Sequence, residues 1–395
     1  MLRRERRIYH SRNNKTMNIK KHLKALRLEY RNSRGRKLNG QYLLIESDDW
    51  GSIRQPSQEA WDEQKKKSSK TDEDPFFHFD SLESNHDMER IFGVLSKYKD
   101  RNGNHPVITA DYAVANPDFQ KIKDSEFKEY YFEPFTETAA RYSDSDQLLK
   151  LCEQGIKSGV WKPQLHCREH VQLPGWMSAL QKGDPEIMWA FEHRMISTAE
   201  TVEPHNHYGY MDAFNYPESD EHELAGVVED AVKLFRNLFG YQSKTFVASC
   251  YVWNDALERI LRNNGITSMQ GSWYQWVPSE NGEGSFVKKV HYNGEHSGNQ
   301  LYLVRNCLFE HSLFGSENCV ESCLKQIESA FRWRQPAIIS SHRVNYMSRL
   351  VPGNGDTGIK MLDELLREII KRWPDVQFIS SDKLAGLYNN MGNCK

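Results

Sequence analysis

Two histidines, His166 and His170, stand four positions apart in the stretch HCREH. Residues at this spacing share one side of a helical turn, so both imidazoles could reach a single cation. A divalent metal bound in this way takes a third ligand from a short carboxylate and keeps an open position for water. The chain has 15 histidines, and chance alone would give on the order of one half such pair. The spacing therefore predicts a metal site only if a third ligand is found.

Two adjacent aspartates, Asp48 and Asp49, follow an apolar run in the stretch LIESDDWGS and supply candidates for that ligand. Neighbouring side chains in extended backbone point to opposite sides, so we expect one carboxylate to bind the metal and the other to stand free beside the metal-bound water. A free carboxylate there is suited to general-base work, and His342, which ends the apolar run of IISSH, could be the matching acid.

Each of these features also has a structural interpretation. An Asp pair after a strand is most often a turn or a helix cap, and a single histidine at a strand end is most often a rim residue. His205 and His207 form a rival H-x-H pair, but no strand precedes them, so we expect loop or substrate contacts there. The concurrence of aspartates and histidines at three strand ends is what favours a metal site.

The elements that must position these residues alternate between short apolar runs and segments of helical periodicity. The predicted strands are 42–46, 106–110, 163–166, 245–249, 267–270, 301–305, 337–341 and 376–379, and the predicted helices are 84–99, 145–158, 219–239, 254–264, 317–333 and 357–372. This alternation predicts a parallel sheet with right-handed crossovers.

The end of the first strand favours a closed (β/α) barrel over an open dinucleotide-binding sheet. An open sheet of that kind would carry G-x-G-x-x-G after its first strand, where this chain has two aspartates. In a barrel the chemistry lies at the C-terminal ends of the strands. We therefore expect the long connections 50–82, 111–143 and 171–218 to be loop insertions on that top face.

The composition predicts a polar protein with one catalytic domain over 41–390. Hydrophobic residues make up 38% of the 395, charged residues 27%, and the mean hydropathy is -0.75. Seven scattered cysteines without a CxxC pair, and no apolar run of a spanning or secretory kind, predict a cytoplasmic protein. With a net charge of -2 we expect no nucleic-acid partner.

The basic residues gather in an N-terminal extension, 1–40, which holds fourteen Lys or Arg against two Glu. Apolar residues recur at helical spacing within it: Ile19, Leu23, Leu26 and Tyr30. This pattern favours a helix packed on the outside of the domain, with weak contact to an anionic membrane surface as the alternative. Met17 is a second candidate for the start of translation.

Over residues 40–385 the order of these motifs resembles the polysaccharide deacetylase family of metal-dependent carbohydrate esterases. The resemblance implies an irregular (β/α) barrel of seven or eight strands. It also assigns roles: Asp48 would be the catalytic base, His342 the acid, and the metal ligands would be Asp49, His166 and His170.

The chain departs from the family pattern at several positions. Glu46 and Ser47 replace the usual Thr-Phe, Trp50 separates the aspartates from Gly51, and Cys167 replaces a small hydroxyl residue. The stretch VASCYVWND lacks the arginine that orients the base. Candidates for this part are Tyr251, Arg305 and Arg343. The aromatic residues that would contact substrate are Trp50, Trp273 and Trp276.

The reaction implied is hydrolysis of an N-acetyl or O-acetyl group on a glycan or sugar precursor, including lipid-linked or nucleotide-linked sugars. The metal, with zinc preferred for an N2O ligand set, would bind the carbonyl oxygen and the attacking water. Three alternatives remain: a related metal-dependent amide hydrolase, a glycoside hydrolase, and a catalytically silent carbohydrate-binding protein on the same scaffold. Glycosidases need carboxyls about 5 to 9.5 Å apart across a cleft, which adjacent aspartates do not naturally provide.

Overall fold

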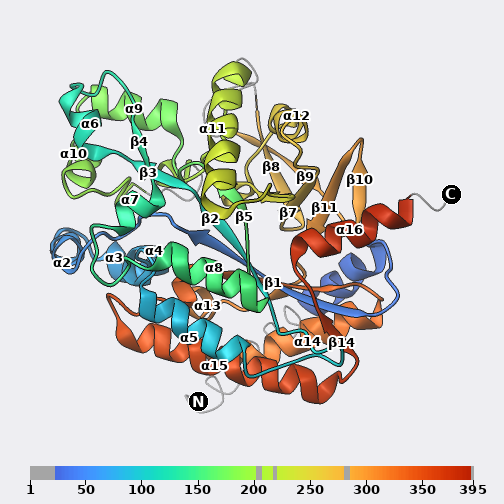
Figure 1. Cartoon of the computed structure of the whole chain (residues 1–395). Helices are drawn as coiled ribbons and strands as arrows, with labels where there is room; N and C mark the ends of the chain where they lie inside the picture. Colours follow the sequence, from blue (N-terminus) through green and yellow to red (C-terminus); the bar gives the residue numbers. More distant parts are fainter. Residues whose placement is uncertain (1–22, 202–206, 217–219, 280–284, 393–395) are drawn as a thin grey trace, which may run out of the picture.

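The apolar runs of the sequence form the central parallel sheet of the protein (Figure 1). The computed structural model describes residues 23–201, 207–216, 220–279 and 285–392. The strands lie in the spatial order β12, β13, β1, β2, β5, β6, β7, β11. Their bounds are β1 (Gln41–Trp50), β2 (Ile108–Ala113), β5 (Trp161–Cys167), β6 (Thr245–Val247), β7 (Ser268–Gly271), β11 (Gln300–Val304), β12 (Cys307–Leu308) and β13 (Ala337–His342).

The sheet closes on itself where β11 passes into β12. Only Arg305 and Asn306 separate these two strands, and β11 pairs with β7 whereas β12 pairs with β13, both in parallel. The Arg305 N–H donates to the Gly271 carbonyl at 2.8 Å, and the Asn306 N–H donates to the Ile338 carbonyl at 3.1 Å on the other side. The interrupted strand β11–β12 is therefore hydrogen-bonded to β7 on one side and to β13 on the other, which joins the two edges of the sheet. The predicted barrel is confirmed.

Two strands add to the sheet without becoming part of the closed ring. β14 (Val376–Phe378), expected as a barrel strand, pairs only with Gln41–Leu43 at the start of β1. β10 (Glu295–Ser297) pairs antiparallel with β11. Within the described residues the barrel therefore has seven strand positions, with β11 and β12 sharing one.

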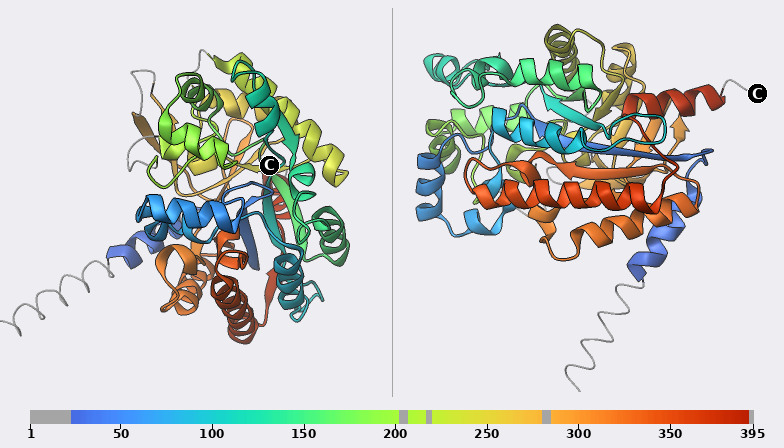
Figure 2. Two further views of the ribbon diagram at one scale, coloured as in Figure 1. Left: turned by 90° about the vertical axis from the view of Figure 1, so that its left-hand side faces the viewer. Right: turned by 60° about the horizontal axis from the view of Figure 1, so that its bottom comes forward.

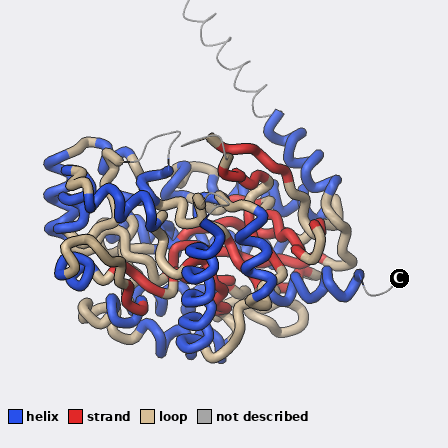
Figure 3. Tube along the Cα trace, turned by 90° about the horizontal axis from the view of Figure 1, so that it is seen from above, coloured by secondary structure: helices blue, strands red, loops and turns tan. Residues whose placement is uncertain are grey.

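The six helices predicted from periodicity are present and lie around the strands, as the view from above shows (Figure 3). They are α5 (Asn85–Leu95), α8 (Leu148–Ser158), α11 (Glu221–Phe239), α12 (Asp255–Asn263), α14 (Cys319–Arg332) and α15 (Pro352–Arg372). In α11 the buried stripe is Leu224, Val228, Ala231 and Phe235, the spacing of an amphipathic helix on a core. A further helix, α16 (Ser381–Gly392), follows β14.

The three long connections leave the C-terminal ends of β1, β2 and β5, as expected for top-face insertions, but they carry structure of their own. The first connection, after β1, holds α2 (Gln58–Lys67), α3 (Lys70–Glu73) and α4 (Pro75–Phe79). The second, after β2, holds β3 (Ala115–Pro117), α6 (Phe119–Asp124), β4 (Phe132–Pro134) and α7 (Phe135–Ala139). The third, after β5, holds α9 (Leu173–Gln181), α10 (Pro185–Glu192) and η1 (His207–Tyr210). The second and third pack together around Trp176 and Phe191 in a separate apolar cluster.

The described part of the N-terminal extension is a helix over 23–34 that lies beside α14 (Figure 2). Glu29 accepts a hydrogen bond from the Trp333 indole at 2.5 Å, and Asn32 donates to Ser329 at 3.0 Å. The helix therefore packs on the domain, although the predicted apolar residues Leu23 and Leu26 remain 52% and 54% exposed. None of the helices in the described ranges combines the length and apolar character that crossing a membrane requires.

The Arg31 guanidinium of this helix lies 3.7 Å from the ring centroid of Trp273, just before the hairpin of β8 (Tyr274–Pro278) and β9 (Phe286–Val290). Trp273 is one of the two tryptophans that the sequence suggested as substrate contacts in this region. Its ring receives a cation–π contact from the N-terminal helix that local sequence does not reveal, and its contact with substrate stays a prediction.

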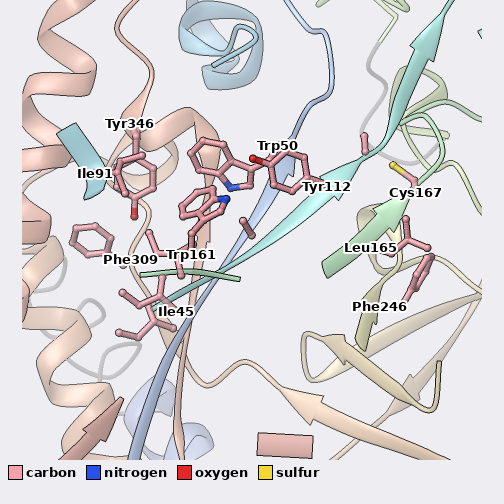
Figure 4. Close-up of a cluster of buried hydrophobic side chains, with 14 of the residues drawn as sticks. Ile45, Trp50, Ile91, Tyr112, Trp161, Leu165, Cys167, Phe246, Phe309 and Tyr346 are labelled. Carbon is pink, nitrogen blue, oxygen red and sulfur yellow. The ribbon is translucent and has the colours of Figure 1, made fainter. Parts of the chain in front are cut away.

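Trp50 lies in the main hydrophobic core with 0% exposure (Figure 4). Its ring packs edge-on against Trp161 at 4.7 Å between centroids, and its indole N–H donates to the Ser47 hydroxyl at 3.0 Å. The expectation that Trp50 contacts substrate is therefore wrong, because the side chain is directed into the core.

We predict that Trp50→Ala lowers the free energy of unfolding by about 3–5 kcal/mol, the usual cost of truncating a buried tryptophan. The matched control is Phe314→Ala, whose ring is 75% exposed and whose loss should change stability by less than about 0.5 kcal/mol. Urea unfolding followed by circular dichroism measures both. Equal effects of the two substitutions would contradict this placement of Trp50.

Candidate metal centre and active site

A bulge at the end of β1 positions the two aspartates. Pairing with β2 runs to Ser47 opposite Ala110 and resumes at Trp50 opposite Tyr112, so Asp48 and Asp49 together face one residue of β2. Asp49 has φ 76°, a left-handed conformation, and a bulge of this kind breaks the alternation of side chains. The expectation that extended backbone sends the two carboxylates to opposite sides is therefore wrong. Both enter the site, each with its own partners.

Asp49 lies with the two histidines of HCREH. Its Oδ1 is 3.6 Å from Nε2 of His166 and 3.3 Å from Nε2 of His170, and all three side chains are at most 5% exposed. Within the described residues these three form the group whose donor atoms, all within 4.8 Å of one another, could hold a metal ion. His166 lies in β5 and His170 in the bend after it, so the pair is not on the helical turn that its spacing suggested.

The donor atoms fit a divalent cation. The Nδ1 atom of His166 lies 2.8 Å from the Val247 carbonyl, which leaves Nε2 as the ligating nitrogen, and this Nε2 is buried without a hydrogen-bond partner. Burial raises the pKa of Asp49, but the neighbouring imidazoles of His166 and His170 outweigh it and hold that pKa well below its ordinary value. Two imidazoles and one carboxylate are an N2O set of the kind that zinc takes at open sites.

Asp48 is bound by Arg305 rather than by the histidines. The guanidinium donates through Nη1 to Oδ2 and through Nη2 to Oδ1, each at 2.6 Å. Burial favours the protonated acid, but the charge of Arg305 prevails and lowers the pKa of Asp48 to about 2. The stretch VASCYVWND lacks an arginine for the base, and the arginine that pairs with Asp48 is Arg305, from the point where the barrel closes. Tyr251, another candidate, accepts from Arg305 Nη1 through its hydroxyl at 3.2 Å.

Arg305 also contacts two carboxylates that the motifs did not indicate. Its Nε donates to Glu46 at 2.7 Å, and its Nη2 lies 3.4 Å from Asp111, which in turn accepts from Gln270 at 2.9 Å. Burial raises the pKa of Glu46, and it raises that of Asp111 well above normal with help from the negative charge of Asp48. The sequence signals were an acidic residue within the first predicted strand, Glu46, and one directly after the second, Asp111.

His342 also lies near Asp48. Its Nε2 is 3.6 Å from Oδ2 of Asp48, and its Nδ1 is 2.6 Å from Oε1 of Glu310. Glu310 is fixed by the Asn345 amide, which donates to its Oε2 at 2.6 Å. Burial disfavours the imidazolium, but the Glu310 carboxylate outweighs it and raises the pKa of His342 to about 10. Glu310 was missed because no motif marks it; it follows β12 by two residues.

Arg343 is a structural residue. It has 0% exposure and donates to both oxygens of Asp80 at 3.1 and 3.0 Å, to Glu83 at 2.9 Å and to the Ser52 carbonyl at 2.7 Å. These bonds tie the connection after β1 to the end of β13. The expectation that Arg343 orients the base or contacts substrate is therefore wrong.

The rival histidine pair is not tested, because His205 and the side chain of His207 lie outside the described residues.

No protein-family model and no curated protein matches this chain. Among solved structures, the first match is a 4-alpha-glucanotransferase from Thermococcus litoralis, with 10% identity and a TM-score of 0.44 over 88% of this chain and 40% of that one. A family 4 carbohydrate esterase from Streptomyces lividans in complex with acetate has 9% identity and a TM-score of 0.36 over 87% and 95%. A mutant peptidoglycan deacetylase from Bacillus subtilis has 9% identity and a TM-score of 0.34 over 91% and 95%.

These likenesses are coarse. All three TM-scores are below 0.5, and the chain spans less than half of the glucanotransferase. Any conclusion about function therefore depends on the side chains of the site.

We predict that the protein binds one equivalent of zinc and that His166→Ala or Asp49→Ala removes it, because two ligands alone hold the ion weakly. The control is His193→Ala, a partly exposed histidine paired with Glu63 at 2.8 Å. Elemental analysis after gel filtration gives the stoichiometry. Full zinc retention in both ligand variants would contradict the assignment.

We also predict that Glu310 sets the protonation of His342. The folded-state pKa of about 10 exceeds the ~6.5 of a free imidazole, so the charged His342 stabilises the fold fully below pH ~6.5, and this stabilisation is lost as pH rises through about 10. Glu310→Gln should lower the pKa of His342 and flatten the pH dependence of unfolding across that window. Imidazole NMR on the metal-free protein measures the pKa, with the exposed Glu328→Gln as control. An unchanged pKa in Glu310→Gln would overturn this prediction.

Proposed function

We propose that the protein is a metal-dependent hydrolase that removes an acetyl group, N-linked or O-linked, from a glycan or sugar precursor. The observation that carries this proposal is the division of labour between adjacent aspartates. Asp49 stands with His166 and His170 as a ligand set, whereas Asp48 is held away from them by Arg305 and lies beside His342. A base and an acid next to a ligand triad are the parts that metal-assisted acyl hydrolysis requires.

Asp49, His166 and His170 would hold the cation, zinc for preference. When bound, it would polarise the acyl carbonyl and lower the pKa of water from ~15.7 toward ~7. The chain itself contributes a backbone-fixed imidazole, because the Val247 carbonyl orients the ring of His166.

Asp48 is suited to accept the proton of the attacking water. With a pKa of about 2 it is ionised at neutral pH, and the two bonds from Arg305 fix the plane of its carboxylate. Orientation of the base is the main service of Arg305, since a misplaced base loses much of its catalytic effect.

His342 is suited to protonate the departing amine or alkoxide. Its pKa of about 10 keeps the imidazolium charged at neutral pH, and its side chain is 20% exposed, so the ring is partly accessible. Its Nε2 is 3.6 Å from Asp48. A small movement therefore allows a proton to pass between base and acid.

The alternatives gain less support from the site. A silent scaffold was suggested by the missing arginine, and the hydrogen bonds from Arg305 to Asp48 support the proposal that Arg305 orients the base in its place. A glycosidase would need a second carboxyl facing a cleft, but Glu310 is engaged with His342 and Asp111 is fully buried. A related amide hydrolase would use the same residues. It differs from an acetyl-sugar hydrolase in the substrate that it cleaves.

The test is acetate release by the zinc-loaded protein from short N-acetylglucosamine oligomers and from O-acetylated xylan. We expect Asp48→Asn to lower the rate at least ~100-fold, the usual cost of losing a general base, while zinc is retained. The control is Asp375→Asn, an exposed aspartate paired with Arg101, which should behave as the wild type. Unchanged activity in Asp48→Asn, or no acetate from either substrate class with zinc bound, would contradict the proposal.

A further inference from the structure

Arg54 lies five residues beyond Asp49, in a part of the chain that is fixed on both sides. The Ile53 N–H donates to the Asn116 side chain at 2.8 Å, and the Gln55 N–H donates to the Asp80 carbonyl at 3.3 Å. A residue anchored in this way presents its side chain in a defined place, as a specificity-determining group must.

The guanidinium of Arg54 is nearly buried but poorly partnered. Its side chain is 9% exposed, and its Nε is buried without a hydrogen bond. Its contact with a carboxylate is a 3.6 Å approach of Nε to Asp80. Asp80 is already committed, because Arg343 binds both of its oxygens. A guanidinium has five N–H donors, and leaving the Nε donor of Arg54 unpaired away from water is costly.

Arg54 lies near the candidate active site. Its guanidinium carbon is 5.2 Å from the ring centroid of Phe76, and this ring meets His342 edge-on at 5.6 Å between centroids. Phe76 therefore contacts both Arg54 and the candidate acid.

We propose that Arg54 binds an anionic group of the substrate, a carboxylate or phosphate on the sugar that carries the acetyl group. This inference rests on the proposed function and adds the substrate class: an acidic carbohydrate rather than a neutral one. Two N–H donors of a guanidinium match two oxygens of such an anion, which gives orientation as well as affinity.

The alternative is that Arg54 only balances the charges of Asp80 and Glu83, which share the single cation Arg343. The two roles differ in what they affect. A balancing charge would affect stability alone, whereas a substrate contact would affect the preference between neutral and anionic ligands.

The test compares N-acetylglucosamine with its 1-phosphate, its 6-phosphate and its 3-O-lactyl ether, N-acetylmuramic acid. Calorimetry on the zinc-loaded protein gives each dissociation constant for the wild type, Arg54→Met, Arg54→Lys and the control Arg349→Met. Arg349 is a partly buried arginine, 16% exposed, paired with Asp144 at 2.8 Å.

We expect at least one anionic sugar to bind the wild type and Arg349→Met at least ~10-fold more tightly than the neutral parent. Arg54→Met should abolish that preference and Arg54→Lys should restore part of it. The arm that responds identifies phosphate or carboxylate. The inference is overturned if no anionic sugar binds preferentially, or if the preference survives in Arg54→Met, whether or not that variant is less stable.

Acetate release from the same samples separates this inference from the proposed function. An Arg54-dependent preference without acetate release would leave the anion contact standing and contradict the deacetylase proposal. Acetate release without an Arg54-dependent preference would support the deacetylase proposal and contradict the anion contact.

Discussion

The ion pair between Arg305 and Asp48 is the interaction on which the rest of the site depends. Arg305 is one of the two residues at which the strand β11–β12 changes partners and closes the barrel. Its guanidinium is 2% exposed and contacts Asp48, Glu46 and Asp111. Charges so buried are tolerated only when they are paired and hydrogen-bonded. Closure of the barrel and placement of the candidate base are thus achieved by the same residue.

The same constraint explains why two neighbouring aspartates differ in their environment. The bulge in β1 brings both carboxylates into the site, and their partners then separate them: an arginine for Asp48 and two imidazoles for Asp49. Burial, together with the negative charge of Asp48, raises the pKa of Asp111 well above its ordinary value, which favours the neutral form of this acid next to the Arg305 guanidinium. Paired carboxylates in different environments are a common means of obtaining distinct roles.

Local pattern predicted much of the fold and the centre of the site. The alternation of strands and helices, the barrel, and the approach of Asp49 to His166 and His170 could be expected, because strand ends of a barrel meet at one face. The bulge in β1 could not be predicted from the sequence, and the direction of Trp50 was therefore predicted wrongly. A single left-handed residue, Asp49, changes which side the following side chains face.

The remaining misses are contacts between residues distant in sequence. Glu310 pairs with His342, Arg343 with Asp80 and Arg31 with Trp273, and none of these pairs is marked by spacing. Arg305 could be named only as one of three candidates, because its role depends on where the barrel closes. Composition shows that such charged residues exist; only the fold shows which carboxylate each one meets.

The most direct measurement of the central claim is anomalous diffraction at the zinc edge from crystals of the full chain grown with zinc. We expect one strong peak, from a zinc ion bound by Nε2 of His166, Nε2 of His170 and a carboxylate oxygen of Asp49. Asp48 should remain hydrogen-bonded to Arg305 and should not bind the metal. A structure with these three side chains apart and no peak between them, or with zinc bound by Asp48 in place of Asp49, would contradict it.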